Sequence, residues 1–409
     1  MISPKKTHIF QANTVPRVTE QIDASHNTPH TSDTMQANEA PHSHLAINDL
    51  LYVAASGFES ACQVNCLPAG HRAARLHGHS FMSEVRARLP KGWAPFAGAE
   101  IGHLHDALSK QTAALDYQYI NDVIALPTDE NIARWLRKQL EVPGIETVGV
   151  QSTAFSGVDL DHQDHAHLWR KYIFQAAHQL PNVSPGHKCG RMHGHGFEVI
   201  LHADQDMGSR DFSIDYDAIN ALWAPLHAQL HLACLNDIEG LENPTSEHLS
   251  AWIWARLKPQ LPELSWVTVY ETGSCGAHFD GSHYRIWKEL TLDSAVQLKR
   301  APQGDPRRRI HGHTFTLRLH LHAPLDRVQG WTVDFGDVKT IFDPIFKSLD
   351  HQPLHDIMGD QDTDTASVAR YIRTLAQPLI PEIDRIDLNE TRGCGVILHW
   401  GALGPALPV

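Results

Sequence analysis

Three histidines near the middle of the chain have the type and spacing of metal ligands. His193 and His195 are separated by one glycine, so on a strand their side chains point to the same face. His178 lies fifteen residues before His193, where a paired strand would bring it beside them. Three imidazoles leave one position open on a zinc ion, as in catalytic zinc sites. The spacing therefore predicts Zn²⁺ bound by these three residues.

A cysteine precedes this motif by four residues. Cys189 is flanked by Lys188 and followed by Arg191, and a thiol beside cations and near a metal ionises readily. Its thiolate would act as a general base or as a nucleophile. Two other interpretations stay open at this stage: a small buried residue, or a fourth zinc ligand that would close the site and make it structural.

The same pattern occurs three times along the chain, which indicates tandem modules. In each copy a residue lies fifteen positions before the first histidine of a His-Gly-His motif; the three sets are Cys62 with His77 and His79, His178 with His193 and His195, and Val296 with His311 and His313. The first set predicts at most a structural or vestigial metal site. The third set lacks a third ligand, so we expect hydrogen bonds there and no tightly bound metal.

Each module is about a hundred residues long and follows the order strand, strand, helix, helix, strand. In the middle module Leu249, Trp252 and Ile253 have helical spacing and follow a Thr-Ser cap, which predicts an amphipathic helix. We expect modules at residues 47–160, 168–280 and 285–402. Residues 1–46 are polar with little periodicity and are predicted to be a disordered tail.

Composition narrows the range of partners and locations. The chain has 409 residues, 42% of them hydrophobic, and a formal net charge of -13, which disfavours nucleic acid and anionic membranes as partners. No apolar run is long enough to span a bilayer, and the first residues lack the apolar stretch of a secretory signal. Six cysteines without framework spacing indicate reduced thiols and a cytoplasmic protein.

Residues 171–276 resemble the 6-pyruvoyl-tetrahydropterin synthase family, and within it the 6-carboxytetrahydropterin synthases of the queuosine branch. The motifs that carry the resemblance are Phe174-Gln-Ala-Ala-His178, Pro-Gly-His-Lys-Cys189-Gly-Arg-Met-His193-Gly-His195 and Glu271-Thr. The three-residue gap between Cys189 and His193 is similar to that of the carboxy branch. The flanking modules resemble the same family more distantly.

The resemblance implies an α+β tunnelling fold, an antiparallel sheet with two helices on one face. Three modules would close a pseudo-trimeric barrel, and two chains would stack as a homodimer with six modules. It also implies zinc and conversion of 7,8-dihydroneopterin triphosphate to 6-carboxy-5,6,7,8-tetrahydropterin. The family uses the cysteine as a base assisted by an Asp-His pair, and a glutamate that anchors the pterin.

The chain departs from the family pattern in a complementary way. The Asp-His pair is present as Asp350-His351 in module three, whereas module two has His231-Leu232 at that place. The other replacements are Val296 for a zinc histidine and Arg307 for the cysteine in module three, and Ala73, Asp116-Tyr117 and Ser152 for the cysteine, the pair and the glutamate in module one. Because the family's site lies between subunits, we expect one composite site per chain, with zinc and Cys189 from module two and the pair from module three.

In this composite site zinc would polarise a side-chain oxygen of the substrate, and Cys189 would remove the adjacent proton. His351, held by Asp350, would relay protons near pH 7. Either Glu271 or Glu390 would anchor the pterin; both precede a threonine, and the better-preserved module favours Glu271. Two alternatives remain: a lyase of the pyruvoyl branch, and a catalytically degenerate pterin-binding or assembly protein.

Overall fold

The computed structural model describes residues 49–67, 70–205, 216–325 and 335–401. Residues 46–409 form one compact unit. The disordered tail predicted for residues 1–46 lies outside the described residues, so that prediction is not addressed by the structure.

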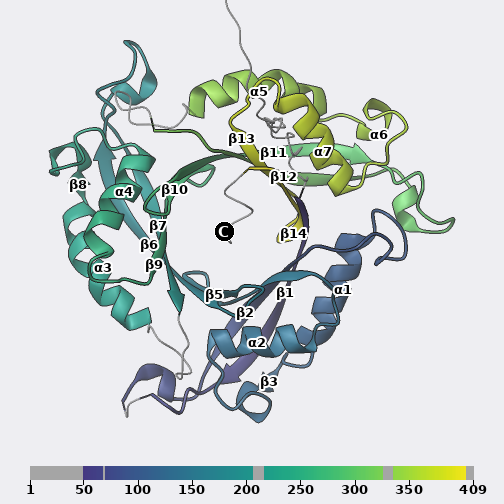
Figure 1. Cartoon of the computed structure of the whole chain (residues 1–409), viewed down its shortest axis with the longest axis horizontal. Coiled ribbons are helices and arrows are strands. Elements are labelled where there is room, and N and C mark those ends of the chain that lie inside the picture. Colours follow the sequence, from purple (N-terminus) through teal and green to yellow (C-terminus); the bar gives the residue numbers. More distant parts are fainter. Residues whose placement is uncertain (1–48, 68–69, 206–215, 326–334, 402–409) are drawn as a thin grey trace, which may run out of the picture. The chain divides into compact units, whose positions relative to one another are not determined.

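The strands of this unit form one closed antiparallel barrel, to which each module contributes four long strands (Figure 1). These are β1 (Asp49–Cys62), β2 (His77–Ala87), β4 (Ile145–Thr153) and β5 (Ser156–Leu160); β6 (Ala166–His178), β7 (His193–Gln205), β9 (Leu264–Thr272) and β10 (Cys275–Phe279); and β11 (Tyr284–Val296), β12 (His311–Leu321), β13 (Ile383–Thr391) and β14 (Cys394–His399). The modules join through the pairs β5–β6 and β10–β11, and β14 pairs with β1 to close the ring. The short strands β3 (Gln118–Tyr119) and β8 (Ala233–Cys234) pair in parallel with β1 and β6.

The helices surround the barrel on its outer side (Figure 1). They are α1 (Glu100–Thr112), α2 (Asp129–Gln139), α3 (Tyr216–Leu230), α4 (Ser246–Leu257), α5 (Phe335–Leu349), the short α6 (Leu354–Ile357) and α7 (Thr365–Ala376). Thr245 caps α4 by accepting a hydrogen bond from the backbone N–H of His248, as the sequence predicted. Among the described residues no helix combines the length and the apolar character needed to cross a bilayer. The α+β tunnelling fold is confirmed.

The apolar core lies between the strands and the outer helices. On β7 the alternating residues Phe197, Val199 and Leu201 are buried in this core. Ile200 lies between Val199 and Leu201, and His202 follows Leu201, so both point to the opposite face, into the barrel. Burying each large apolar side chain contributes about 1.5–3 kcal/mol, so the alternation fixes which face of the strand carries the helices.

The strand register sets the position of the repeated motif. His178 at the end of β6 pairs with His193 at the start of β7. Cys62 pairs with His77 in module one, and Val296 pairs with His311 in module three. The fifteen-residue spacing in the sequence therefore leaves fourteen residues to connect two directly opposed strand ends.

Candidate metal and catalytic site

The structure brings the three predicted zinc ligands of module two together. One ring nitrogen each from His178, His193 and His195 and a carboxylate oxygen of Glu271 lie within 4.8 Å of one another. His178 is fully buried and packs edge-on against Phe197, and the two other imidazoles are half-buried. The cluster thus extends the row of core residues on the helix-facing side of the β6–β7 hairpin.

Backbone carbonyls fix the protonation of two of these imidazoles. Nδ1 of His178 lies 3.1 Å from the carbonyl oxygen of Pro244, and Nδ1 of His193 lies 2.8 Å from that of Arg191. Because a carbonyl only accepts, each Nδ1 carries the proton and each Nε2 offers a lone pair. Nε2 of His178 is buried without a hydrogen-bond partner among the described residues. A buried lone pair of this kind fits a metal ligand, so the residues present suit zinc.

Glu271 is the fourth member of the cluster. Its Oε1 lies 3.4 Å from Nε2 of His195, and its Oε2 accepts a hydrogen bond from the Ser246 hydroxyl at 3.1 Å. Burial alone raises the pKa of Glu271, but the interactions with His195, His178 and Ser246 outweigh burial and lower its pKa below the ordinary value. The carboxylate is therefore ionised near neutral pH and can pair with N–H donors of a ligand. The Glu271-Thr motif predicted this role, whereas the contact with His195 has no signal in the local sequence.

Cys189 lies in a 3-10 turn, Lys188–Gly190, and is half-buried. Its N–H donates to Nδ1 of His187 at 3.2 Å, and its carbonyl accepts from the N–H of Leu180 at 2.8 Å. The first bond caps the turn, and the second ties its backbone to the segment just after β6. The same capped turn occurs in the other modules, with Ala73 and Arg307 at the position of Cys189.

The predicted Asp-His pair is formed within module three. Nδ1 of His351 donates to Asp350 at 2.8 Å, and Asp350 accepts a second bond from the N–H of Asp293 on β11. The pair follows the end of α5, and the depression beside His351 is lined by residues of module three, among them His311 and His313. The hydrogen bond to Asp350 raises the pKa of His351 above its ordinary value. The hydrogen bonds of the pair join it to Phe346 and Asp293 of its own module, so a composite site with module two in one chain remains a prediction.

Module three lacks two parts of the metal site at its own hairpin. Val296 is buried where the other modules have a ligand, and Arg307 replaces the cysteine. The Arg307 guanidinium bonds to Asp305 and lies 4.6 Å above the ring of Phe96 in module one. Glu390 keeps the hydroxyl partner seen in module two, because Thr365 donates to it.

Module one retains a different ligand set. Sγ of Cys62, together with one ring nitrogen each of His77 and His79, forms a group within 4.8 Å, and Sγ lies 3.6 Å from Nε2 of His77. The carbonyl of Arg75 accepts a bond from Nδ1 of His77 at 2.7 Å, as the equivalent carbonyl does in module two. Ser152 stands where module two has Glu271.

The repeats correspond to known protein domains. The family model of 6-pyruvoyl tetrahydropterin synthase matches residues 51–156, 167–282 and 285–399. The chain therefore belongs to the 6-pyruvoyl tetrahydropterin synthase family and carries three of its domains in tandem.

Individual relatives match one domain's length. A 6-carboxy-5,6,7,8-tetrahydropterin synthase of Synechocystis is 38% identical over 120 residues, which cover 27% of this chain and 91% of the relative. A dihydroneopterin monophosphate aldolase of Pyrococcus furiosus is 31% identical over 94 residues, 22% of this chain and 79% of the relative. The solved 6-pyruvoyl tetrahydropterin synthase of Caenorhabditis elegans has 14% identity and a TM-score of 0.26, covering 29% of this chain and 95% of that one.

Proposed function

We propose that the chain is a zinc-dependent 6-carboxytetrahydropterin synthase. It would convert 7,8-dihydroneopterin triphosphate to 6-carboxy-5,6,7,8-tetrahydropterin in queuosine (7-deazaguanine) biosynthesis. The observation that carries the proposal is the convergence of His178, His193 and His195 beside an ionised Glu271, with Cys189 on the adjoining turn. The similarity to the Synechocystis synthase supports the choice of substrate and product.

The residues of the module-two site would each have a separate role in the reaction. A zinc ion, when bound, would supply Lewis-acid chemistry to an oxygen of the substrate side chain. Glu271 binds the N–H edge of the pterin through charge-assisted hydrogen bonds, and Ser246 holds that carboxylate in its rotamer. The Cys189 thiolate takes a proton from the carbon next to the polarised oxygen.

The Asp-His pair would come from a second copy of the chain. His351 is 76% exposed and lines the same depression as Ile310, an exposed apolar residue. Leu76 and Met192 are exposed at the positions equivalent to Ile310, and each of these three side chains is more than half exposed. Repeated apolar exposure on loops beside the motif is typical of an interaction surface.

A homodimer with six modules would cover this surface in both chains. The Asp350-His351 pair of one chain would then complete the Cys189 site of its partner, as isologous contacts between two copies allow. In this arrangement the composite site still consists of the predicted residues, but Cys189 and the Asp350-His351 pair belong to different chains. It also accounts for His231-Leu232 in module two, because that module receives its pair from outside.

Two other functions are each favoured by one observation. The Pyrococcus furiosus relative favours an aldolase acting on a dihydroneopterin phosphate. The loss of the Asp-His pair in module two favours a pterin-binding or assembly protein without turnover. A 6-pyruvoyl product is the outcome expected for the sister branch of the family.

Product analysis separates these activities. The full chain, loaded with zinc, is incubated with 7,8-dihydroneopterin triphosphate, and the products are identified by mass spectrometry with an assay for acetaldehyde. We expect 6-carboxy-5,6,7,8-tetrahydropterin and acetaldehyde. A pyruvoyl product, a cleaved pterin aldehyde or alcohol, or no product at all would each contradict the proposal. The Cys189→Ala variant serves as the inactive control.

A further inference from the structure

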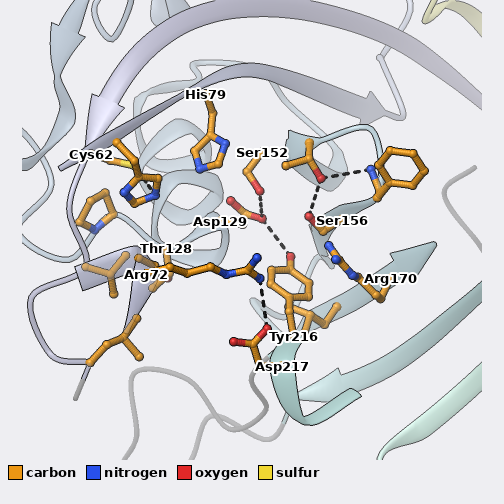
Figure 2. Close-up of a pocket in the computed structure, with 18 of the residues that line it drawn as sticks. Cys62, Arg72, His79, Thr128, Asp129, Ser152, Ser156, Arg170, Tyr216 and Asp217 are labelled. Atoms are coloured by element: carbon orange, nitrogen blue, oxygen red, sulfur yellow. Dashed lines mark hydrogen bonds and ion pairs between the residues drawn. The ribbon is translucent and has the colours of Figure 1, made fainter. Parts of the chain in front are cut away.

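A cavity of about 880 Å³ lies between modules one and two. Its walls come from the metal-ligand motif of module one and from β6 and α3 of module two (Figure 2). This volume falls within the range of pockets that bind small molecules. The reaction assigned to the zinc cluster of module two does not use it.

One wall of the cavity carries a thiol and two imidazoles. Cys62 opposes His77 across the β1–β2 hairpin, and His79 lies on the same face two residues later. The bond between His77 and the Arg75 carbonyl directs the lone pair of His77 Nε2 toward Sγ of Cys62. One sulfur and two nitrogen ligands leave an open position on a zinc-type ion.

Near this group, module one carries a carboxylate on the helix and a hydroxyl on the strand, whereas module two carries the hydroxyl on the helix and the carboxylate on the strand. In module two the helix residue Ser246 donates to the strand residue Glu271. In module one the strand residue Ser152 donates to the helix residue Asp129 at 2.9 Å. Asp129 occupies the helix position of Ser246, and Ser152 occupies the strand position of Glu271. The two modules therefore have a carboxylate bonded to a hydroxyl between the same helix and strand positions, with the two partners reversed; Glu271 belongs to the 4.8 Å group of its module, whereas Asp129 lies outside that of module one.

A purely structural role for Asp129 does not explain its burial. A carboxylate in the first turn of a helix interacts well with the helix dipole, but an exposed one does so without loss of hydration. Asp129 is 8% exposed, beside Glu130, which is 4% exposed. Because the equivalent helix begins with Ser246 in module two, the fold does not require an acid here.

Module two completes the surroundings of this carboxylate. The hydroxyl of Tyr216, at the start of α3, donates to the same oxygen of Asp129 at 2.9 Å as Ser152 does (Figure 2). Both hydrogen bonds found within the described residues thus reach Oδ2, which leaves Oδ1 to receive a ligand donor. Arg72, paired with Asp217 at 3.1 Å, and Arg170 also line the cavity and add positive charge to it.

We propose that this cavity is a second ligand site that binds without turnover. Cys62, His77 and His79 would hold a zinc-type ion. Asp129 would receive adjacent N–H donors of a planar heterocycle, while Arg72 and Arg170 face its anionic substituent. Ala73 stands where module two has Cys189, so this site has no thiolate at the position of the base. The proposal rests on the cavity itself and does not depend on which reaction module two catalyses.

Cobalt substitution tests the metal part, because a thiolate ligand gives Co²⁺ a charge-transfer absorption that imidazoles do not. The full-length Cys189→Ala variant, which removes the thiol on the turn of module two, is titrated with Co²⁺. We expect two ions per chain and a thiolate band, and the further substitution Cys62→Ser removes the band and one ion. One ion per chain without a thiolate band would overturn the proposal.

Ligand counting tests the carboxylate. Neopterin triphosphate, an oxidised pterin, is titrated calorimetrically into the metal-loaded Cys189→Ala protein, with Asp122→Asn as the matched surface control. We expect two ligands per chain; Asp129→Asn weakens one of them by about tenfold or more, and Glu271→Gln weakens the other. Ser152→Ala, which keeps the charge and removes one donor, provides a second variant and is expected to weaken the same site as Asp129→Asn. One ligand per chain, indifferent to Asp129→Asn and Ser152→Ala, would overturn the proposal even if module two forms its product.

Discussion

Oε1 of Glu271 lies 3.4 Å from Nε2 of His195, a ring nitrogen of the metal cluster. The other oxygen of this carboxylate is held by Ser246 at the start of α4, and the carbonyl of Pro244, two residues earlier, accepts a hydrogen bond from His178. One helix start thus positions both the proposed pterin-binding carboxylate and an imidazole of the proposed metal cluster. A change at this helix start would affect substrate orientation and metal binding together.

Substituting each glutamate in turn identifies the pterin anchor. Glu271→Gln removes the charge and leaves the shape, so we expect kcat/KM to fall by about 10- to 100-fold, the effect of one or two charge-assisted hydrogen bonds. Glu390→Gln is the matched control, since Glu390 has the same hydroxyl partner in a module that lacks a full ligand set. Steady-state kinetics on both variants decides; a larger loss in Glu390→Gln would assign the anchor to module three.

Removing one imidazole tests the metal cluster. His178→Ala deletes a fully buried imidazole proposed to bind zinc through Nε2, which has no hydrogen-bond partner among the described residues, so we expect the protein to lose one zinc equivalent and its activity. His311→Ala is the control, because Val296 opposes it and supplies no ligand atom. Metal analysis by mass spectrometry on dialysed proteins gives the count, and an unchanged count in His178→Ala would refute the assignment.

The role of the thiol is separable from metal binding. Cys189→Ser leaves the three imidazoles in place, so we expect full zinc content with a rate about 10²- to 10⁴-fold lower, the usual contribution of a general base. Cys66→Ser alters an exposed cysteine in the loop of module one and should leave turnover unchanged. Loss of zinc in Cys189→Ser would instead indicate a fourth metal ligand.

Mixing two inactive variants distinguishes a site within one chain from a site between chains. Cys189→Ala and His351→Ala are each expected to be inactive alone. If the pair reaches Cys189 from a second chain, co-expression restores about a quarter of the wild-type rate, because half of the dimers are mixed and each of those has one intact site of two. A mixture as inactive as its parents would place both residues in one chain, and an active His351→Ala would exclude the pair from catalysis.

The histidines inside the barrel predict loss of stability in acid. Burial lowers the pKa of His202 from 6.5 to about 3. Its Nε2 lies 3.2 Å from the hydroxyl oxygen of Thr268, within hydrogen-bond distance. At a pH between these two pKa values the unfolded chain binds a proton at this histidine and the folded chain does not. The contribution of neutral His202 to the free energy of unfolding is therefore fully present above about pH 6.5 and is lost as the pH falls toward about 3. The slope is up to about 1.4 kcal/mol per pH unit for this residue.

Urea unfolding at about pH 7 and about pH 4.5 measures this effect. His202→Gln cannot take up the proton in either state, so we expect a smaller difference between the two midpoints than in the wild type. His162→Gln, at an exposed position, is the control and should behave as the wild type does. Equal pH dependence in all three proteins would show that His202 is not buried as a neutral imidazole.

Patterns that repeat within the chain predicted most of the fold. The spacing from His178 to His193 led to an antiparallel hairpin, and the structure pairs these two residues directly. The Thr-Ser signal before Leu249 led to the start of α4. Both inferences succeeded because strand alternation and helix capping are local properties of the backbone.

Contacts between residues far apart in the chain were not predicted from the sequence. The contact of His195 with Glu271 joins residues 76 positions apart through the packing of β7 on β9, and no local pattern encodes it. The reversed positions of carboxylate and hydroxyl at Asp129 and Ser152 were not predicted. Ser152 alone looks like the loss of a glutamate, and Asp129 alone looks like part of a helix cap. Comparing the modules at both positions together was the signal that would have revealed it.

The central claim is that the three imidazoles of module two hold one zinc ion with an open position. Anomalous diffraction at the zinc absorption edge, measured on crystals of the full chain, tests it directly. The account predicts a peak bonded to Nε2 of His178, His193 and His195, with Glu271 free to bind the pterin. A map with no peak between these nitrogens, or with Cys189 bonded to the ion as a fourth protein ligand, would contradict it.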